Sequence, residues 1–148
     1  MIRSMVELQH TVAVSPERIG PVLDAYAELA LGNPEPLVSL LDASVEWLEW
    51  TGAREARRLV GAEPVARLLR DCVRRGAARE YIGAAKVGAG SLAIEFAEPW
   101  WADRPRRLAA LLRRDSFQVL TIGRLIERIE SHSSFLAPAG ECTRALTA

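Results

Sequence analysis

Residues 114–130 read RDSFQVLTIGRLIERIE, and this segment decides the fold. Every second residue from Asp115 to Thr121 follows the two-residue period of a β-strand. A turn is predicted at Gly123, and residues 125–132 predict a returning strand. The segment therefore predicts a closing β-hairpin. It also raises a question, because an aspartate begins this apolar hairpin and a row of Arg and Glu follows its turn.

Three helices are predicted before this hairpin. Ser15-Pro16-Glu17 supplies a helix cap, a proline at the first helical position and an acid in the first turn, and Gly32 supplies a stop. The sequence from Asn33 repeats the start signal and predicts a short helix that ends near Asp42. A third helix opens at Pro64, after which apolar residues recur at helical spacing.

The remaining segments predict strands and loops. The segment 45–50 is short and rich in aromatic residues, which predicts a strand. The segments 80–87 and 91–98 predict a hairpin. The arginine-rich segment between Thr51 and Pro64 is interpreted as a solvated loop. Residues 104–114 fit either a strand, which we prefer, or a short capped helix.

Composition indicates one domain and argues against several classes of partner. The chain has 148 residues, is 49% hydrophobic and carries a formal net charge of zero. We expect a domain over residues 15–134, an N-terminal extension over 1–14 and a flexible tail over 135–148. Balanced charge disfavours nucleic acid and membrane surfaces as partners, and no long apolar run or signal peptide is present, so a cytoplasmic location is expected.

The order of the predicted elements is that of an α+β fold: a cone-shaped, curved, mostly antiparallel sheet with three helices packed on its concave face. Three segments, in this order and spacing, resemble the nuclear-transport-factor-2-like superfamily, which includes steroid delta-isomerases, limonene-epoxide hydrolases and small polyketide cyclases. The resemblance runs from Pro16 to Ser134 and is carried by AYAELALGNPEPLVSLL, GAEPVARLL and DSFQVLTIGRLIERIE.

The resemblance implies roles for several residues. Tyr26 and Asp115 match the tyrosine and the carboxylic acid that form the oxyanion hole of steroid isomerases, in which the acid stays protonated. The position of that branch's base holds Trp47, which cannot abstract a proton, so Glu49 on the same strand face is the predicted replacement. Glu130 falls near one catalytic acid of the epoxide-hydrolase branch, whose Arg-x-Asp partner is not evident here.

The resulting hypothesis is a cofactor-free isomerase, cyclase or epoxide-opening hydrolase acting by general acid/base catalysis. Its ligand would be a hydrophobic oxygenated molecule of polyketide or terpenoid type in a cone-shaped pocket. No metal or cofactor is expected, because zinc-ligand spacing, a phosphate loop and a dinucleotide fingerprint are absent from the sequence. The predicted catalytic residues are Asp115, Tyr26, Glu49 and Glu130, and the predicted substrate-binding residues are Trp47, Phe96, Trp100, Phe117, Arg128 and His132.

Structural interpretations stand beside these functional ones. Tyr26 also fits a core position, Asp115 also fits an ion pair with a neighbouring arginine, and His132 also fits an exposed strand end. Arg128 and Glu130 also fit a homodimer interface across the open face of the sheet. The second hypothesis is accordingly a non-catalytic ligand-binding or dimerisation module of the same fold, and a third, nucleic-acid binding through arginines, is disfavoured by the net charge.

Overall fold

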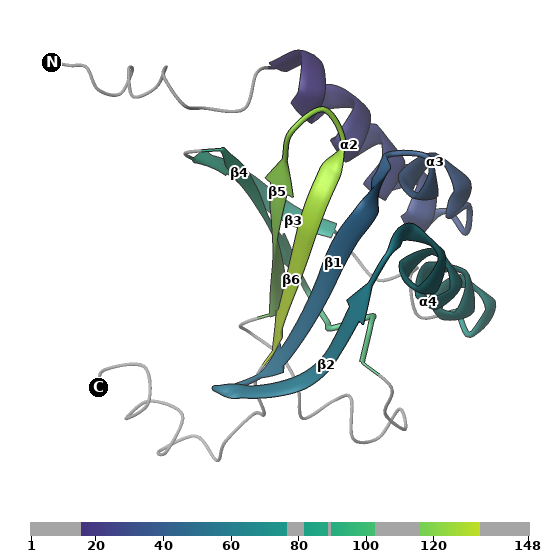
Figure 1. The fold of residues 1–148 in the computed structure, drawn as a ribbon, viewed down its shortest axis with the longest axis vertical. Coiled ribbons are helices and arrows are strands. Elements are labelled where there is room, and N and C mark those ends of the chain that lie inside the picture. Colours follow the sequence, from purple (N-terminus) through teal and green to yellow (C-terminus); the bar gives the residue numbers. More distant parts are fainter. Residues whose placement is uncertain (1–15, 77–81, 89, 103–115, 134–148) are drawn as a thin grey trace, which may run out of the picture.

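A computed structural model describes residues 16–76, 82–88, 90–102 and 116–133 (Figure 1). Four sequence predictions fall outside these ranges. They are Asp115, the 104–114 segment, the N-terminal extension and the C-terminal tail.

The three helices of the described ranges lie on one side of a curved sheet (Figure 1). They are α2 (Pro16–Ala30), α3 (Glu35–Val38) and α4 (Ala62–Arg74). Helix α2 begins at the predicted proline, and Gly32, with φ of 98°, follows its end in a conformation that suits glycine. The predicted second helix was too long, because α3 ends at Val38 and a strand already begins at Leu41.

The sheet has six strands in the order β2-β1-β6-β5-β4-β3. Strands β1 and β6 are parallel and every other neighbouring pair is antiparallel. The predicted α+β fold, with a curved and mostly antiparallel sheet, is therefore confirmed. The strands are β1 (Leu41–Thr51), β2 (Arg54–Val60), β3 (Ile82–Gly88), β4 (Ser91–Phe96), β5 (Ser116–Ile122) and β6 (Ile126–Ser133).

The arginine-rich segment is a strand, so its interpretation as a loop was wrong. Strand β2 forms a hairpin with β1 around Gly52, whose φ is 63°. Arg57 lies opposite Glu49 in this hairpin, and Arg58 lies opposite Leu48. Cross-strand charge pairing suits an edge strand, since charged side chains there also discourage pairing with other chains.

The two faces of the sheet have different surroundings, and we call them the inner face and the outer face. The inner face carries the core and is covered by the helices, and on the central strands it presents Trp47 of β1 and Ile129 of β6, which are register partners and both fully buried. Leu120 of β5 lies beside Ile129 on the same face. The outer face presents the intervening residues, because successive side chains of a strand point to opposite sides.

The helices complete the core from the other side. In α4 the apolar stripe is buried while Arg67, Arg70 and Arg74 are exposed, as the predicted helical spacing requires. Helix α2 contributes Val22 and Leu29, both at most 3% exposed. Within the described ranges, no helix combines the length and the apolar character needed to cross a membrane.

Candidate functional site

A chain of buried hydrogen bonds crosses the inner face from α2 to β6. The Tyr26 hydroxyl donates to Gln118 Oε1 at 2.6 Å, and Gln118 Nε2 donates to Ser131 Oγ at 2.9 Å. All three residues are at most 1% exposed. Burial raises the pKa of Tyr26 far above its ordinary value, so the phenol stays neutral. Its single proton is used in the bond to Gln118.

Glu49 is the second polar centre of the inner face. It is 7% exposed, and its Oε1 accepts hydrogen bonds from Trp47 Nε1 at 3.1 Å and from Arg57 Nε and Nη2 at 3.0 and 2.9 Å. Arg57 Nη2 also lies 3.4 Å from the Trp101 carbonyl oxygen, so the guanidinium links β2 to the turn after β4. The sequence correctly placed Trp47 and Glu49 on one face, and the structure adds the arginine that neutralises the carboxylate.

Five aromatic rings gather beside these polar groups. Phe96 lies at the centre, with its ring centroid 6.0 Å from Tyr26, 5.7 Å from Trp100 and 5.6 Å from Trp101. Trp47 joins through Trp100 at 6.5 Å. Most of these pairs meet edge to face, a favourable aromatic geometry. The predicted binding residues Trp47, Phe96 and Trp100 are thus brought together with Tyr26, and all four are buried.

Within the part of the chain that the structure describes, two polar atoms of this aromatic region are buried without a hydrogen-bond partner. They are Trp101 Nε1 and Ser116 Oγ. Ser116 is the register partner of Phe96, and Trp101 packs on the Phe96 ring, so both groups flank the same side chain. An unpaired buried polar group is costly and uncommon in native proteins.

Four predicted site residues lie on the outer face, so the expectation that they line the interior was wrong. Ile129, Ser131 and Ser133 take the buried positions of β6, which leaves the alternate residues outside. The residues placed outside are Phe117, Arg128, Glu130 and His132.

These outer residues contact one another instead of Tyr26. The His132 ring stacks on Phe117 at 4.7 Å and on Trp50 at 6.4 Å between ring centroids. Glu130 lies 3.2 Å from Arg128 Nη1 and 3.5 Å from His132 Nε2. They form a half-exposed surface cluster across β5, β6 and β1.

Sequence reasoning missed Gln118, Ser131, Ser116 and Trp101 as inner polar groups. The sequence contained one signal for Gln118. This residue lies on the same face of β5 as Leu120 and Ile122, the larger aliphatic residues of this strand, so it is expected to point into the core. No comparable signal identified Arg57, since its role depends on a strand that the sequence pattern concealed.

Cys72 on α4 is a free, buried cysteine. Burial raises the pKa of the Cys72 thiol to about 11, although Arg75 Nη2 lies 3.4 Å from its sulfur. A thiol with so high a pKa is a poor nucleophile at neutral pH. Among the residues that the structure describes, no cluster of three or more His, Cys, Asp or Glu side chains could hold a metal ion.

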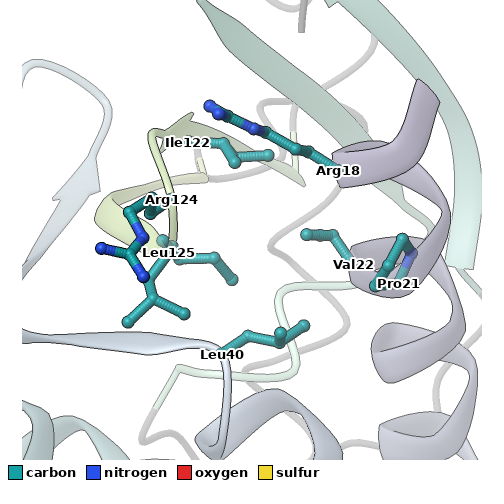
Figure 2. A pocket seen from close by; sticks show the side chains of 8 residues that line it. Arg18, Pro21, Val22, Leu40, Ile122, Arg124 and Leu125 are labelled. Atoms are coloured by element: carbon teal, nitrogen blue, oxygen red, sulfur yellow. The ribbon is translucent and has the colours of Figure 1, made fainter. Parts of the chain in front are cut away.

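A pocket of about 110 Å³ lies away from the predicted site, between the start of α2 and the β5–β6 turn (Figure 2). None of the predicted site residues lines it. The lining residues are Arg18, Pro21, Val22, Leu40, Ile122, Arg124, Leu125 and Ile126.

Three helices against the concave face of a curved mixed sheet define a cone-shaped α+β protein, and solved structures show the same architecture. An NTF2-like protein of unknown function from Mesorhizobium loti aligns with a TM-score of 0.60 and 14% identity over 80% of this chain and 92% of that chain. A putative ketosteroid isomerase from Kribbella flavida aligns with a TM-score of 0.54 and 13% identity over 83% and 82% of the two chains.

The epoxide hydrolase/cyclase-like enzyme SalBIII, described in pyran ring formation of the polyether salinomycin, aligns with a TM-score of 0.53 and 16% identity over 79% of this chain and 90% of that chain. No family model and no curated protein matches the sequence. The chain has the NTF2-like fold, as the sequence resemblance predicted. Proteins with this fold include isomerases, cyclases, epoxide hydrolases and proteins of unknown function. The similarity to solved structures therefore establishes the fold, and an activity has to be inferred from the candidate site.

Proposed function

We propose that the inner face of the cone binds a neutral, apolar small molecule that carries an oxygen acceptor. The observation that supports this is the pair of unpartnered groups, Trp101 Nε1 and Ser116 Oγ, beside Phe96. An indole N–H can only donate a hydrogen bond, and a serine hydroxyl can donate one as well. A carbonyl, hydroxyl or ether oxygen of a ligand would accept a hydrogen bond from these unpaired donors.

The surroundings favour a ligand without charge. The Glu49 carboxylate is already paired with Arg57, and Tyr26 is held neutral. A charged ligand would therefore enter an aromatic region without a counter-ion, at a high desolvation cost. The rings of Phe96, Trp100 and Trp101 instead match an apolar ligand body.

The test uses two probes that differ only in a carbonyl group in place of a methylene group, para-fluoroacetophenone and para-fluoroethylbenzene, followed by fluorine NMR with the full chain. We expect the ketone to bind at least about fivefold more tightly, because a buried donor gains about 1–3 kcal/mol when it finds a partner. The preference should disappear in the double variant Trp101→Phe, Ser116→Ala. Trp100→Phe is the matched control, since it removes the same ring volume nearby and leaves both unpaired groups in place. Equal binding of both probes to the wild-type protein would contradict the proposal.

A catalytic role for Glu49 is the second candidate. Its Oε1 accepts all three of the hydrogen bonds described above, which leaves Oε2 as the oxygen that could accept a proton from a ligand. In this version the protein would be an isomerase, cyclase or epoxide-opening hydrolase, with Asp115 still the predicted acid. Glu49→Gln would keep ketone binding and abolish turnover of a substrate once found, whereas unchanged turnover would remove Glu49 from the mechanism.

We also propose that the outer face pairs with a second copy of the chain. The stacked rings of Trp50, His132 and Phe117 form a half-exposed row flanked by charges of both signs, as a two-fold interface between identical faces requires. Sedimentation of the wild-type protein should show a dimer that Glu130→Arg weakens and the remote change Arg67→Glu leaves intact. A wild-type monomer at all concentrations would contradict the pairing.

A further inference from the structure

The pocket at the β5–β6 turn is built as an amphipathic receptor (Figure 2). Its buried wall is aliphatic, with Val22, Ile122 and Ile126 at most 8% exposed. Its rim is exposed and carries two guanidinium groups, from Arg18 and Arg124. Apolar and cationic groups thus meet at one opening to solvent.

The guanidinium groups of Arg18 and Arg124 at the rim can donate further hydrogen bonds. Arg18 donates from Nη1 to the Gly123 carbonyl oxygen at 2.8 Å, which fixes its side chain across the turn. Neither Arg18 nor Arg124 takes part in the ion pairs between described side chains. The Glu127 carboxylate folds over Gly123 on the same turn, so the described side chains around this turn include two cations, Arg18 and Arg124, and one acid. The local charge therefore favours one added anion.

The volume limits the size of a ligand. An apolar cavity of about 150 Å³ holds one benzene molecule. The pocket of about 110 Å³ therefore suits a shorter aliphatic group such as a branched four-carbon tail.

We propose that this pocket binds a short, branched aliphatic carboxylate. The tail lies against Val22, Ile122 and Ile126, and the carboxylate is held at the rim by Arg18 with Arg124 as a second cation. This site is separate from the inner-face site, because it shares no residue with the aromatic cluster around Phe96. The proposal for this pocket therefore does not rest on the one for the inner face.

The experiment is an NMR titration of the full chain with isovalerate, its neutral amide isovaleramide, and acetate. We expect isovalerate to shift the backbone amides of residues 18–22 and 122–126 along a saturable curve. Isovaleramide and acetate should bind at least about tenfold more weakly, because one lacks the charge-assisted hydrogen bond and the other lacks the apolar tail.

Variants separate the roles of charge and tail. Arg18→Gln and Leu125→Asp should each weaken isovalerate binding at least about tenfold, since the first removes a cation and the second adds an anion at the rim. Both positions are exposed, so folding should survive. Arg18→Lys should keep most of the affinity, and Arg67→Gln on α4 should have no effect. Equal binding of the acid and its amide, or shifts that acetate alone reproduces, would overturn the proposal.

Discussion

The inner and outer faces of the central strands carry similar side chains, but these side chains differ in their exposure to solvent. Each face has a tryptophan from β1 and an arginine–glutamate pair that joins β1 to a neighbouring strand. On the inner face the side chains of Arg57 and Glu49 are 33% and 10% exposed in their ion pair. On the outer face Arg128 and Glu46 pair at 3.2 Å with side chains 46% and 32% exposed. The face of the sheet on which a side chain lies therefore has more influence on its contribution to stability than its residue type.

Exposure to water explains why the two ion pairs contribute differently to stability. An exposed ion pair exchanges hydration for a screened attraction and contributes about 0–1 kcal/mol. A buried carboxylate that loses its cation keeps its charge in a medium that solvates it poorly, which costs several times more. Trp47 and Trp50 of β1, and Arg57 and Arg58 of β2, point to opposite faces, so each pair tests this difference.

The largest contrast is expected between the two tryptophans of β1. Trp47→Ala should destabilise the protein by about 3–5 kcal/mol, because it empties a fully buried position in the core. Trp50→Ala should cost about 1–2 kcal/mol, since Trp50 is half-buried on the outer face. Urea unfolding monitored by circular dichroism measures both, and similar costs would show that the faces are equally buried.

The second contrast lies between consecutive arginines of β2. Arg57→Ala should cost about 2 kcal/mol, because it leaves Glu49 without its cation and also releases the Trp101 carbonyl. Arg58→Ala should cost less than about 1 kcal/mol, because its pairs with Glu46 and Glu55 are exposed. Chemical unfolding at low and high salt checks the assignment: the Arg58 effect should shrink with salt, and a salt-sensitive Arg57 effect would place that pair in solvent.

The smallest effect at neutral pH concerns the inner hydrogen-bond chain. Tyr26→Phe should cost about 1–2 kcal/mol, because Gln118 Oε1 loses its donor in a buried site. Burial raises the folded-state pKa of Tyr26, so the unfolded chain ionises first once the pH exceeds the ordinary value near 10.

The contribution of Tyr26 is therefore complete below about pH 10 and is lost above it, by about 1.4 kcal/mol for each pH unit. The stability gap between wild type and Tyr26→Phe should narrow accordingly when unfolding is measured from about pH 9 to about pH 11. A constant gap would mean that the Tyr26 phenol ionises as readily in the folded protein as in the unfolded chain.

Much of the fold was predictable because local signals agreed with it. The Pro16 start of α2 and the closing hairpin around Gly123 both appear where the sequence placed them. Strand β2 was hidden, because Arg54-Glu55-Ala56-Arg57-Arg58 lacks apolar alternation, and its cross-strand ion pairs depend on the glutamates of β1. An edge strand stabilised by cross-strand charge has no signature in its own segment.

The site was predictable only in part. Tyr26, Trp47 and Glu49 were placed correctly, because a helical stripe and a strand period each fix a side chain's direction. Arg128, Glu130 and His132 were predicted to belong to the pocket but lie on the outer face, and the final strand gave no clear signal because both of its faces contain polar residues. Ile129 is buried by its packing against Trp47 and Leu120, which are tertiary neighbours that a single segment does not reveal.

The parallel pairing of β1 with β6 has a consequence for synthesis of the chain. Glu46 and Arg128, joined across this pair, are 82 residues apart in sequence. The middle of the sheet therefore cannot assemble until the last strand has left the ribosome, and the β1–β2 hairpin must wait beside an unfilled neighbour. The charged edge strand would help to keep that nascent hairpin from associating with other chains during the delay.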